Sequence, residues 1–283
     1  MNNYYIITND TKDCGLRLTN RINEYLKKKN CIVHVGEMSV YQEHSYTDSD
    51  KIPADTECII VVGGDGTLIQ AARDLYDKDI PFIGVNMGTL GFLAEFDESN
   101  LEQALDRIVA DEYFIEERIM LQGSIVRDGN TIAENIAWND IVFTRGGCLR
   151  VIDFNVYVNG QFLKMYSADG MIISTPTGST AYNLSAGGPI LEPCANIISL
   201  SPICAHGIGS RSIVLSADST VEIEICKKRH LSDEDSVVYF DGTNACTLHE
   251  NDRIVVNKAL ANTRMIRLNA LSFVERLNKK LKD

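Results

Sequence analysis

The clearest candidate for a chemically active site in this sequence is a glycine-rich loop that contains a single carboxylate. The loop, residues 63–67 with the sequence GGDGT, directly follows the apolar run 58–62 and leads into a second apolar stretch. That order is typical of a strand, a glycine turn and the start of a helix, a junction whose free N–H groups bind phosphate. A carboxylate there repels phosphate unless it holds a metal ion or accepts a proton, so the loop predicts both phosphate binding and chemistry at Asp65. The residues expected to hold the phosphates are Gly64, Gly66 and Thr67.

The spacing of this loop excludes two common nucleotide-binding loops. A Walker loop would end in G-K-[ST], and a Rossmann fingerprint would have glycine where Ile69 stands. The alternative is an ordinary strand-to-helix turn, in which Asp65 only caps the helix.

A second glycine-rich loop, 84–93, follows the next apolar run, 81–85. Loops at the carboxyl ends of adjacent parallel strands share one crevice, so this loop should face Asp65. Its candidate ligand-binding residues are Asn86 and Phe92. The alternative is a turn whose apolar side chains only fill the core.

Two polar segments follow further along the chain. Asn139 and Asp140 form a polar pair inside an apolar run, where an amide and a carboxylate suit ribose hydroxyls and an adenine edge. Residues 167–189 are dense in small hydroxyl residues and glycine, so they could follow a nucleotide closely, with Tyr182 over a ring. A buried surface this polar needs hydrogen-bond partners, which a ligand is expected to supply. The alternatives are an ordinary turn for the pair and a strand with a long loop for the second segment. The candidates in that segment are Ser167, Asp169, Thr177, Thr180, Ala181, Tyr182 and Ser185.

Three further candidates are isolated in the sequence. Arg150 could meet a diphosphate, with an exposed surface arginine as the alternative. Cys204 lies in the segment PICAH at 202–206, whose histidine is expected to be structural. Thr243 could reach a ligand from 240–244, a segment that first of all predicts a hairpin turn.

Hydrophobic spacing predicts the elements that position these residues. Up to about residue 113, short apolar runs alternate with helical stripes, which predicts an α/β domain with an open parallel sheet, doubly wound. Beyond that point, period-two alternation predicts an all-β, antiparallel domain with a tight turn at Asn159-Gly160. The tail, 271–281, returns to helical spacing, and this C-terminal helix is expected to dock on the first domain. The predicted domains are 1–114 with 264–283 returning, and 115–263. The expected strands are 4–8, 31–35, 58–62, 81–85, 152–158, 212–215, 221–225, 237–240 and 253–256.

The composition indicates an ordinary globular protein, with 45% hydrophobic and 23% charged residues. The net charge of -12 argues against nucleic acid or an anionic membrane as a partner. The 8 cysteines lack the spacing of a zinc site, so no metal-ligating residue is expected. Without a signal peptide or a membrane-spanning apolar run, the chain is expected to be cytoplasmic.

Taken together, the motifs resemble those of the bacterial NAD kinases. The resemblance covers nearly the whole chain, in order: the loop 63–67, the Asn139-Asp140 pair, the segment 169–182 and Gly187-Gly188-Pro189. The GGDGT loop alone also occurs in diacylglycerol and sphingosine kinases and in relatives of phosphofructokinase. The run TPTGSTAY at 175–182 is far more specific.

The resemblance implies a kinase that moves a phosphoryl group from ATP, or in some members polyphosphate, to the 2′-hydroxyl of the adenosine ribose of NAD, giving NADP. It implies a divalent metal, Mg²⁺, and a homodimer or homotetramer. The α/β domain would be the phosphate-donor domain, and the all-β domain would bind NAD. Asp65 would be the catalytic carboxylate. The residues implied to contact the dinucleotide are Asn139 and Asp140 at ribose and adenine, Phe92 near the adenine, and Asp169 with 180–185 along the site.

Three places depart from the family pattern, and two other functions share the motifs. Asp140 stands where the family often has the longer glutamate, Ser167 stands where it often has a basic residue, and PICAH at 202–206 replaces the commoner PICPH. A lipid kinase of the GGDGT type would need a basic amphipathic membrane face, which the sequence lacks. A non-catalytic dinucleotide sensor would keep the pocket without turnover, and the intact Asp65 argues against it.

Overall fold

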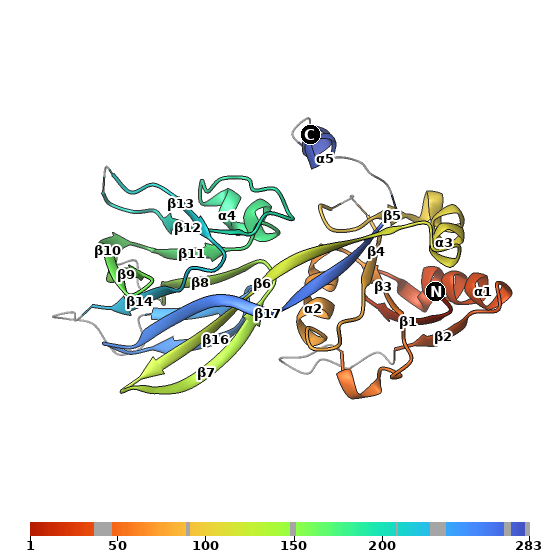
Figure 1. Ribbon diagram of the computed structural model, residues 1–283, viewed down its shortest axis with the longest axis horizontal. Coiled ribbons are helices and arrows are strands. Elements are labelled where there is room, and N and C mark those ends of the chain that lie inside the picture. The colour runs from red at the N-terminus through yellow and green to blue at the C-terminus, as the bar shows by residue number, and fades with distance from the viewer. Residues whose placement is uncertain are drawn as a thin grey trace. The chain divides into compact units, whose positions relative to one another are not determined.

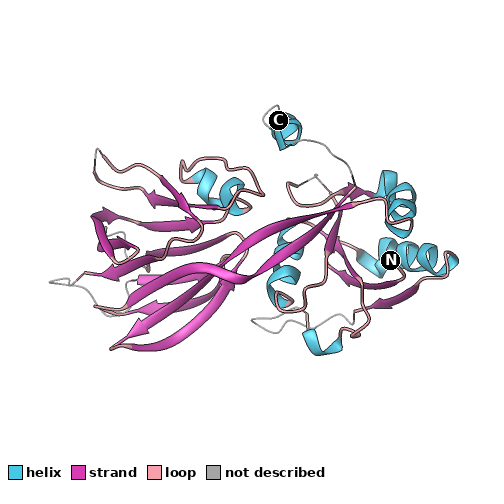
Figure 2. Cartoon of the chain, viewed as in Figure 1, coloured by secondary structure: helices cyan, strands magenta, loops and turns pink. Residues whose placement is uncertain are grey.

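The computed structural model describes residues 1–36, 47–88, 91–147, 151–207, 209–226, 236–268 and 273–280. The chain divides into two compact units, which can be followed by colour in Figure 1. The first combines Met1–Arg118 with Ala261–Asp283, and the second is Ile119–Leu260. Helices and strands are mixed in the first unit, whereas the second consists almost entirely of strands (Figure 2).

The first unit contains a parallel sheet, as the alternation of apolar runs and helical stripes predicts. Its strands pair in the order β2-β1-β3-β4, and the short β5 adds to β4. The helices α1 and α3 lie on one side of the sheet and α2 on the other (Figure 1), which confirms the doubly wound arrangement. The strands are β1 Asn3–Thr8, β2 Ile32–Val35, β3 Cys58–Gly63, β4 Phe82–Asn86 and β5 Phe96–Asp97. The helices are α1 Arg17–Lys28, α2 Asp65–Asp74, α3 Leu101–Val109 and α5 Phe273–Lys280, with 3₁₀ turns at Cys14–Leu16, Ser49–Lys51 and Glu98–Asn100.

Alternate residues of the parallel strands form the core of this unit. One face of the sheet packs against the apolar stripes of α1 and α3, because strand side chains alternate between faces while helix side chains repeat every three to four residues. The predicted tail helix is present as α5 and is grouped with this unit; Leu271 and Leu281 lie outside the described residues. The buried cluster includes Tyr4, Ile6, Ile22, Leu26, Ile60, Val62, Ile83 and Leu105.

The second unit is antiparallel β, as predicted. One sheet has the order β13-β12-β11-β8-β15-β16, and a second set pairs as β10-β9-β14-β17, with β6 and β7 forming a hairpin. Phe143 and Phe154 meet edge to face in its core, with ring centroids 5.0 Å apart. The turn Asn159-Gly160 has φ of 52° and 74°, the conformation that the sequence predicts. The strands are β7 Asn130–Ala137, β8 Asp140–Arg145, β9 Ile152–Val158, β10 Gln161–Ala168, β11 Gly170–Ser174, β12 Ile197–Ile203, β13 Ile213–Ser216, β14 Val221–Ile225, β15 Ser236–Phe240 and β16 Thr243–Leu248.

Two features differ from the expectations: the length of two strands and an additional helical turn. Two long strands, β6 Phe114–Arg127 and β17 Arg253–Arg267, each begin in one unit and end in the other, whereas spacing predicts β17 only as far as residue 256. A single helical turn, α4 Tyr182–Ser185, follows the 3₁₀ turn Gly178–Thr180. In the described residues no helix combines the length and apolarity needed to cross a membrane.

Candidate functional site

Asp65 is the first residue of α2, directly after the strand that ends at Gly63. Its carboxylate accepts the backbone N–H of Phe92 at 2.8 Å and that of Leu93 at 3.4 Å. The second glycine-rich loop therefore does face Asp65, as predicted. The carboxylate is held by backbone groups of its own unit at the carboxyl end of the sheet.

Gly91 makes this approach possible, although it is not among the site residues that the sequence predicts. A β carbon built there would stand 2.1 Å from Oδ1 of Asp65 and 2.2 Å from Oδ2, which no side chain can tolerate. The signal in the sequence was the recurrence of glycine within 84–93, which predicts that the loop faces Asp65 but does not single out Gly91.

A surface pocket of about 560 Å³ opens beside the loop. Lys12 lies on its wall and approaches Gly64 so closely that a β carbon on Gly64 would meet Nζ at 2.4 Å. Within the described part of the chain, Lys12 forms no ion pair. An unpaired cation beside free loop N–H groups can bind phosphate. The pocket is lined by Lys12, Leu18, Asn86, Met87, Gly88, Asp97, Glu98 and Ser99.

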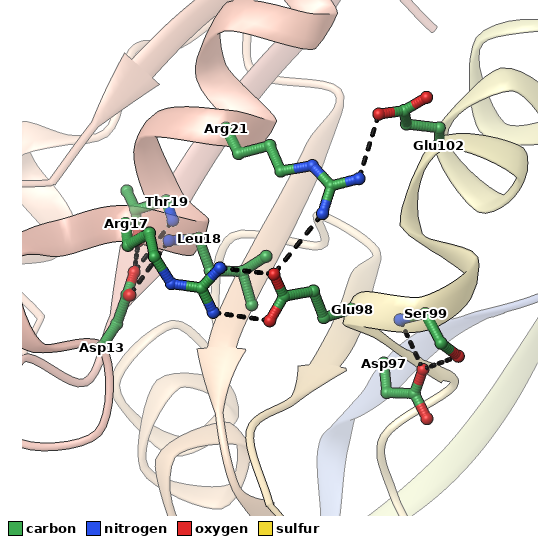
Figure 3. A network of polar contacts seen from close by, with 9 residues as sticks. All are labelled: Asp13, Arg17, Leu18, Thr19, Arg21, Asp97, Glu98, Ser99 and Glu102. Carbon is green, nitrogen blue, oxygen red and sulfur yellow. Dashed lines mark hydrogen bonds and ion pairs between the residues drawn. The ribbon is translucent and has the colours of Figure 1, made fainter.

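The rim of this pocket is fixed by ion pairs and helix caps (Figure 3). Arg17 of α1 holds Glu98 with both guanidinium nitrogens, at 2.5 and 2.6 Å. Asp13 accepts the N–H groups of Leu18 and Thr19 at 3.0 and 2.8 Å. Burial would raise the pKa of Asp13, but these hydrogen bonds outweigh burial and lower it. Glu98 therefore joins the 3₁₀ turn Glu98–Asn100 to α1, and Asp13 caps the start of α1.

Three of the remaining predicted residues of this unit, unlike Gly66, have structural partners. Thr67 accepts the side-chain N–H of Asn9 at 3.0 Å. Asn86 is buried and donates to the carbonyl of Gly88 at 2.6 Å, which fixes the second loop. The Phe92 ring lies under Nζ of Lys280 from α5, 5.8 Å from the ring centroid. Gly66 is exposed, with open space where a β carbon would stand.

A buried arginine supports the loop behind Asp65. Arg267 is fully buried and donates to the carbonyl of Leu93 at 3.1 Å. Its guanidinium also pairs with Glu95 at 2.9 Å and Glu116 at 3.1 Å. Burial alone would raise the pKa of Glu116, but the charges of Arg118 and Arg267 lower it to about 2. The charges around Arg267 are thus compensated, as buried charges must be.

In the second unit, the predicted polar pair lies at a chain reversal. β7 ends at Ala137 and β8 begins at Asp140, so Asn139 is in the bend and not inside a strand as predicted. The carboxylate of Asp241 accepts the N–H groups of Trp138, Asn139 and Asp140 at 2.8, 2.7 and 3.1 Å. The apolar flanks that indicated a strand belong to two strands. Asp241 was read only as part of a hairpin turn, because its partners lie about a hundred residues away.

Asp140 is a buried acid, with 5% of its surface exposed. Burial, followed by the negative charge of Asp241, raises the pKa of Asp140 to about 7. A carboxyl group in this state is a strong hydrogen-bond partner for a ligand hydroxyl once that ligand replaces water.

In the hydroxyl-rich segment 167–189, several side chains bond to backbone groups of the protein. Thr175 donates its hydroxyl to the carbonyl of Trp138 at 2.6 Å and its N–H to that of Asn139 at 2.9 Å. Ser179 is fully buried; its hydroxyl donates to the carbonyl of Pro176 at 2.6 Å and accepts the N–H of Leu191 at 3.0 Å. The expectation that a ligand must satisfy this polar run is therefore wrong for these residues, because backbone groups satisfy them.

Other residues of the run remain open to a ligand. Tyr182 is 47% exposed and Ser185 is exposed, while Thr180 and Ala181 are half-buried. Thr177 is buried. Gly178 packs on the bend, where a β carbon would stand 2.2 Å from the carbonyl oxygen of Asn139.

The last candidates have local partners. Asp169 pairs with Arg145 at 2.9 Å, and Ser167 donates to Asp153. Thr243 donates to the carbonyl of Phe240 at 3.2 Å. Cys204 is exposed at φ 46°. Arg150 lies outside the described residues.

Two protein-family models match this chain, one mainly in each of the two units. The ATP-NAD kinase N-terminal domain matches residues 5–113, and the ATP-NAD kinase C-terminal domain matches residues 138–268. The NAD kinase of Lachnospira eligens is 44% identical over 293 residues, which cover 99% of this chain and 100% of that protein. The NAD kinase of Lachnoclostridium phytofermentans is 44% identical over 285 residues, which cover 100% of both.

Two solved structures share the fold. Yeast NADH kinase complexed with NADH has a TM-score of 0.86 at 23% identity and covers 100% of this chain and 88% of that chain. An NAD kinase from Archaeoglobus fulgidus in complex with ATP has a TM-score of 0.78 at 24% identity and covers 99% of both. The resemblance indicated by the motifs is confirmed, and the chain belongs to the NAD kinase family of phosphotransferases, which phosphorylate NAD.

Proposed function

We propose that this kinase transfers the γ-phosphoryl group of ATP to the 2′-hydroxyl of the adenosine ribose of NAD, with Asp65 as the general base. The observation that carries the assignment is the carboxylate of Asp65, which stands at a phosphate-type loop and is oriented by the N–H groups of Phe92 and Leu93. Polyphosphate is the alternative donor. In the relatives, the fold holds ATP in the Archaeoglobus fulgidus protein and NADH in the yeast protein.

The reaction needs a base because a ribose hydroxyl is a weak nucleophile. Asp65 would accept the hydroxyl proton as the new O–P bond forms, while the bond from the γ-phosphorus to the bridging oxygen breaks and ADP leaves. General-base help of this kind is typically worth about 10²–10⁴-fold. Alignment and charge neutralisation supply most of the rest in phosphoryl transfer.

The donor phosphates would lie against the N–H groups of the loop 63–67, with Lys12 as their cation. Mg²⁺ commonly binds through one or two carboxylates together with substrate phosphates. The loop fits that mode, since the carboxylate of Asp65 stands at the helix start proposed to hold the phosphates. Bound Mg²⁺ would supply positive charge that offsets the charge of the phosphates.

The second unit would bind NAD. Asn139 and Asp140 would bond the ribose and the adenine edge, and the exposed Tyr182 would cover a ring. We place the enzyme in the cytoplasm as a homodimer or homotetramer. The other residues proposed to line the dinucleotide are Asp169, Thr177, Thr180, Ala181 and Ser185.

Steady-state kinetics of Asp65→Asn test the base assignment. We expect kcat to fall at least about 10²-fold, with KM for NAD within threefold of wild type. Asp77→Asn, an exposed acid beyond α2, is the matched control and should retain full activity. Turnover of Asp65→Asn within tenfold of wild type, with normal NAD binding, would refute the assignment. NAD binding without NADP formation by the wild-type protein would instead indicate a sensor.

A further inference from the structure

The bend that carries Asn139 and Asp140 is built around one carboxylate. Oδ1 of Asp241 accepts the N–H groups of Asn139 and Asp140 at 2.7 and 3.1 Å, and Oδ2 accepts that of Trp138 at 2.8 Å. The N–H of Asp241 returns to the carbonyl of Asp140 at 3.0 Å. Three successive N–H groups that converge on one anion form a rigid concave nest.

The turn itself does not require these contacts. Asp241 and Gly242 occupy a two-residue hairpin turn with φ of 48° and 73°. The hairpin of β6 and β7 has the same pair, Asp128-Gly129, with φ of 50° and 78°. Asp128 is exposed, and no hydrogen bond to its carboxylate is present among the described residues. An Asp-Gly turn therefore forms equally well without the nest.

The opposite side of the bend is held just as firmly. Thr175 donates to the carbonyls of Trp138 and Asn139. Asp241 thus fixes the N–H side of the bend while Thr175 fixes the carbonyl side. With both sides fixed, the backbone that carries the Asn139 and Asp140 side chains is held in one conformation.

Asp241 also sets the electrostatic environment of Asp140. The strands paired with β8 add no other carboxylate at this point in the described residues: β11 places Ser174 opposite Asp140, and Tyr239 of β15 lies opposite Val142. Burial and the charge of Asp241 both favour the neutral form of Asp140.

We infer that Asp241 is a positioning residue for NAD: it acts through the backbone of Trp138, Asn139 and Asp140 to orient the two side chains that bind the adenosine. The inference rests on the proposed function, in which Asn139 and Asp140 contact NAD. Asp241 itself touches neither the donor phosphates nor the base Asp65 in this assignment.

The test compares Asp241→Asn and Asp241→Glu with the matched control Asp128→Asn and with Asn139→Ala. For Asp241→Asn we expect kcat/KM for NAD to fall at least tenfold while KM for ATP stays within twofold. Asp128→Asn should match wild type in both. A merely structural defect would change the constants for both substrates.

The pH profile supplies a second readout. KM for NAD should rise in wild type as pH falls below about 7, because the ionised Asp140 accepts ribose hydroxyls. In Asp241→Asn the rise in KM for NAD should move to lower pH, because the negative charge beside Asp140 is removed. Asp241→Glu keeps that charge, so the pH profile should keep its wild-type inflection while kcat/KM for NAD falls. Should Asp241→Asn fail to fold by circular dichroism, Asp241→Glu carries the test alone.

Two outcomes distinguish a failure of the role inferred for Asp241 from a failure of the proposed NAD contacts. If Asn139→Ala weakens NAD binding but both Asp241 variants keep kcat/KM for NAD within twofold, the inference is overturned and the proposed function stands. If Asn139→Ala also leaves NAD binding unchanged, the proposed NAD contacts are wrong and the role of Asp241 falls with them.

Discussion

Gly91 lies face to face with the carboxylate of Asp65, so that a β carbon there would stand 2.1 Å from Oδ1. The φ of Gly91 is not in the left-handed region, so the absence of a side chain, and not backbone freedom, is what the position requires. The next N–H, that of Phe92, bonds the same carboxylate at 2.8 Å. Close approach and hydrogen bond together orient Asp65.

Gly91→Ala should therefore impair catalysis while the protein still folds. The added methyl must displace the carboxylate, and a displaced base loses most of the roughly 10²-fold or greater help it gives. Single-turnover rates at saturating NAD and ATP measure the effect, with Gly147→Ala, where the β carbon meets open space, as the control. A rate within fivefold of wild type would show that the approach has no catalytic consequence.

Lys12→Ala should weaken binding of the phosphate donor and leave NAD binding intact. A charge-assisted hydrogen bond contributes about 1.5 kcal/mol or more, so KM for ATP should rise about tenfold. The initial rates are measured against each substrate in turn, and Lys28→Ala, an exposed lysine at the end of α1, should change neither constant. An unchanged KM for ATP would remove Lys12 from the donor site.

Asp140→Asn should stabilise the fold and weaken NAD binding. Because the pKa of this acid is raised in the folded state, its ionisation destabilises the fold progressively as pH rises from about 4 to about 7. The rise from 3.8 to about 7 corresponds to at most about 4 kcal/mol. Thermal melts should show Tm higher by several degrees at pH 8 and by less at pH 5, whereas Asp128→Asn should show no such pH-dependent gain. A Tm difference independent of pH would contradict the argument.

Arg267→Met should destabilise the first unit strongly. Removing one partner of a buried ion pair costs about 3–5 kcal/mol, because the other charges remain buried. Urea unfolding measures the loss, and Arg264→Met, whose pair with Asp79 is partly exposed at 3.5 Å, should cost under about 1 kcal/mol. Equal losses in the two variants would refute the comparison.

The same cluster governs acid stability. The pKa of Glu116 is lowered in the folded state to about 2, so its stabilising contribution is complete above its ordinary value of 4.5 and disappears as pH falls toward 2. Urea midpoints should therefore fall more steeply between pH 4.5 and pH 2 in wild type than in Arg267→Met.

The local sequence pattern predicts the helices, strands and loops of the site. It does not predict the side-chain contacts between those loops and residues distant in the chain. Spacing of apolar residues predicts β3 and α2, and chain direction in a parallel sheet predicts that 84–93 meets Asp65. The approach of Gly91 and the reach of Lys12 depend on side-chain distances that no short window contains. Asp241 lies about a hundred residues from its partners, and in the sequence it has the same signature as Asp128 in an ordinary turn.

The hydroxyl-rich segment shows the converse error. Its composition indicates a surface that needs a ligand, yet the hydroxyls of Thr175 and Ser179 donate hydrogen bonds to backbone carbonyls. Composition reports how many polar groups are present but not which way they turn. In the folded chain, Thr175 of this segment bonds the bend at residues 138–140, whereas Tyr182 is exposed.

The position of Arg267 in the chain has a consequence for how the enzyme is made. Domains generally fold from the N-terminus during synthesis, but Leu93, Glu95 and Glu116 are joined to an arginine in β17, which the ribosome adds after the whole second unit. The GGDGT loop and the second loop, 84–93, are translated early, whereas Arg267, which donates to the carbonyl of Leu93, is translated late. A nascent chain therefore carries Asp65 before Arg267 is available to hold the loop that orients this carboxylate.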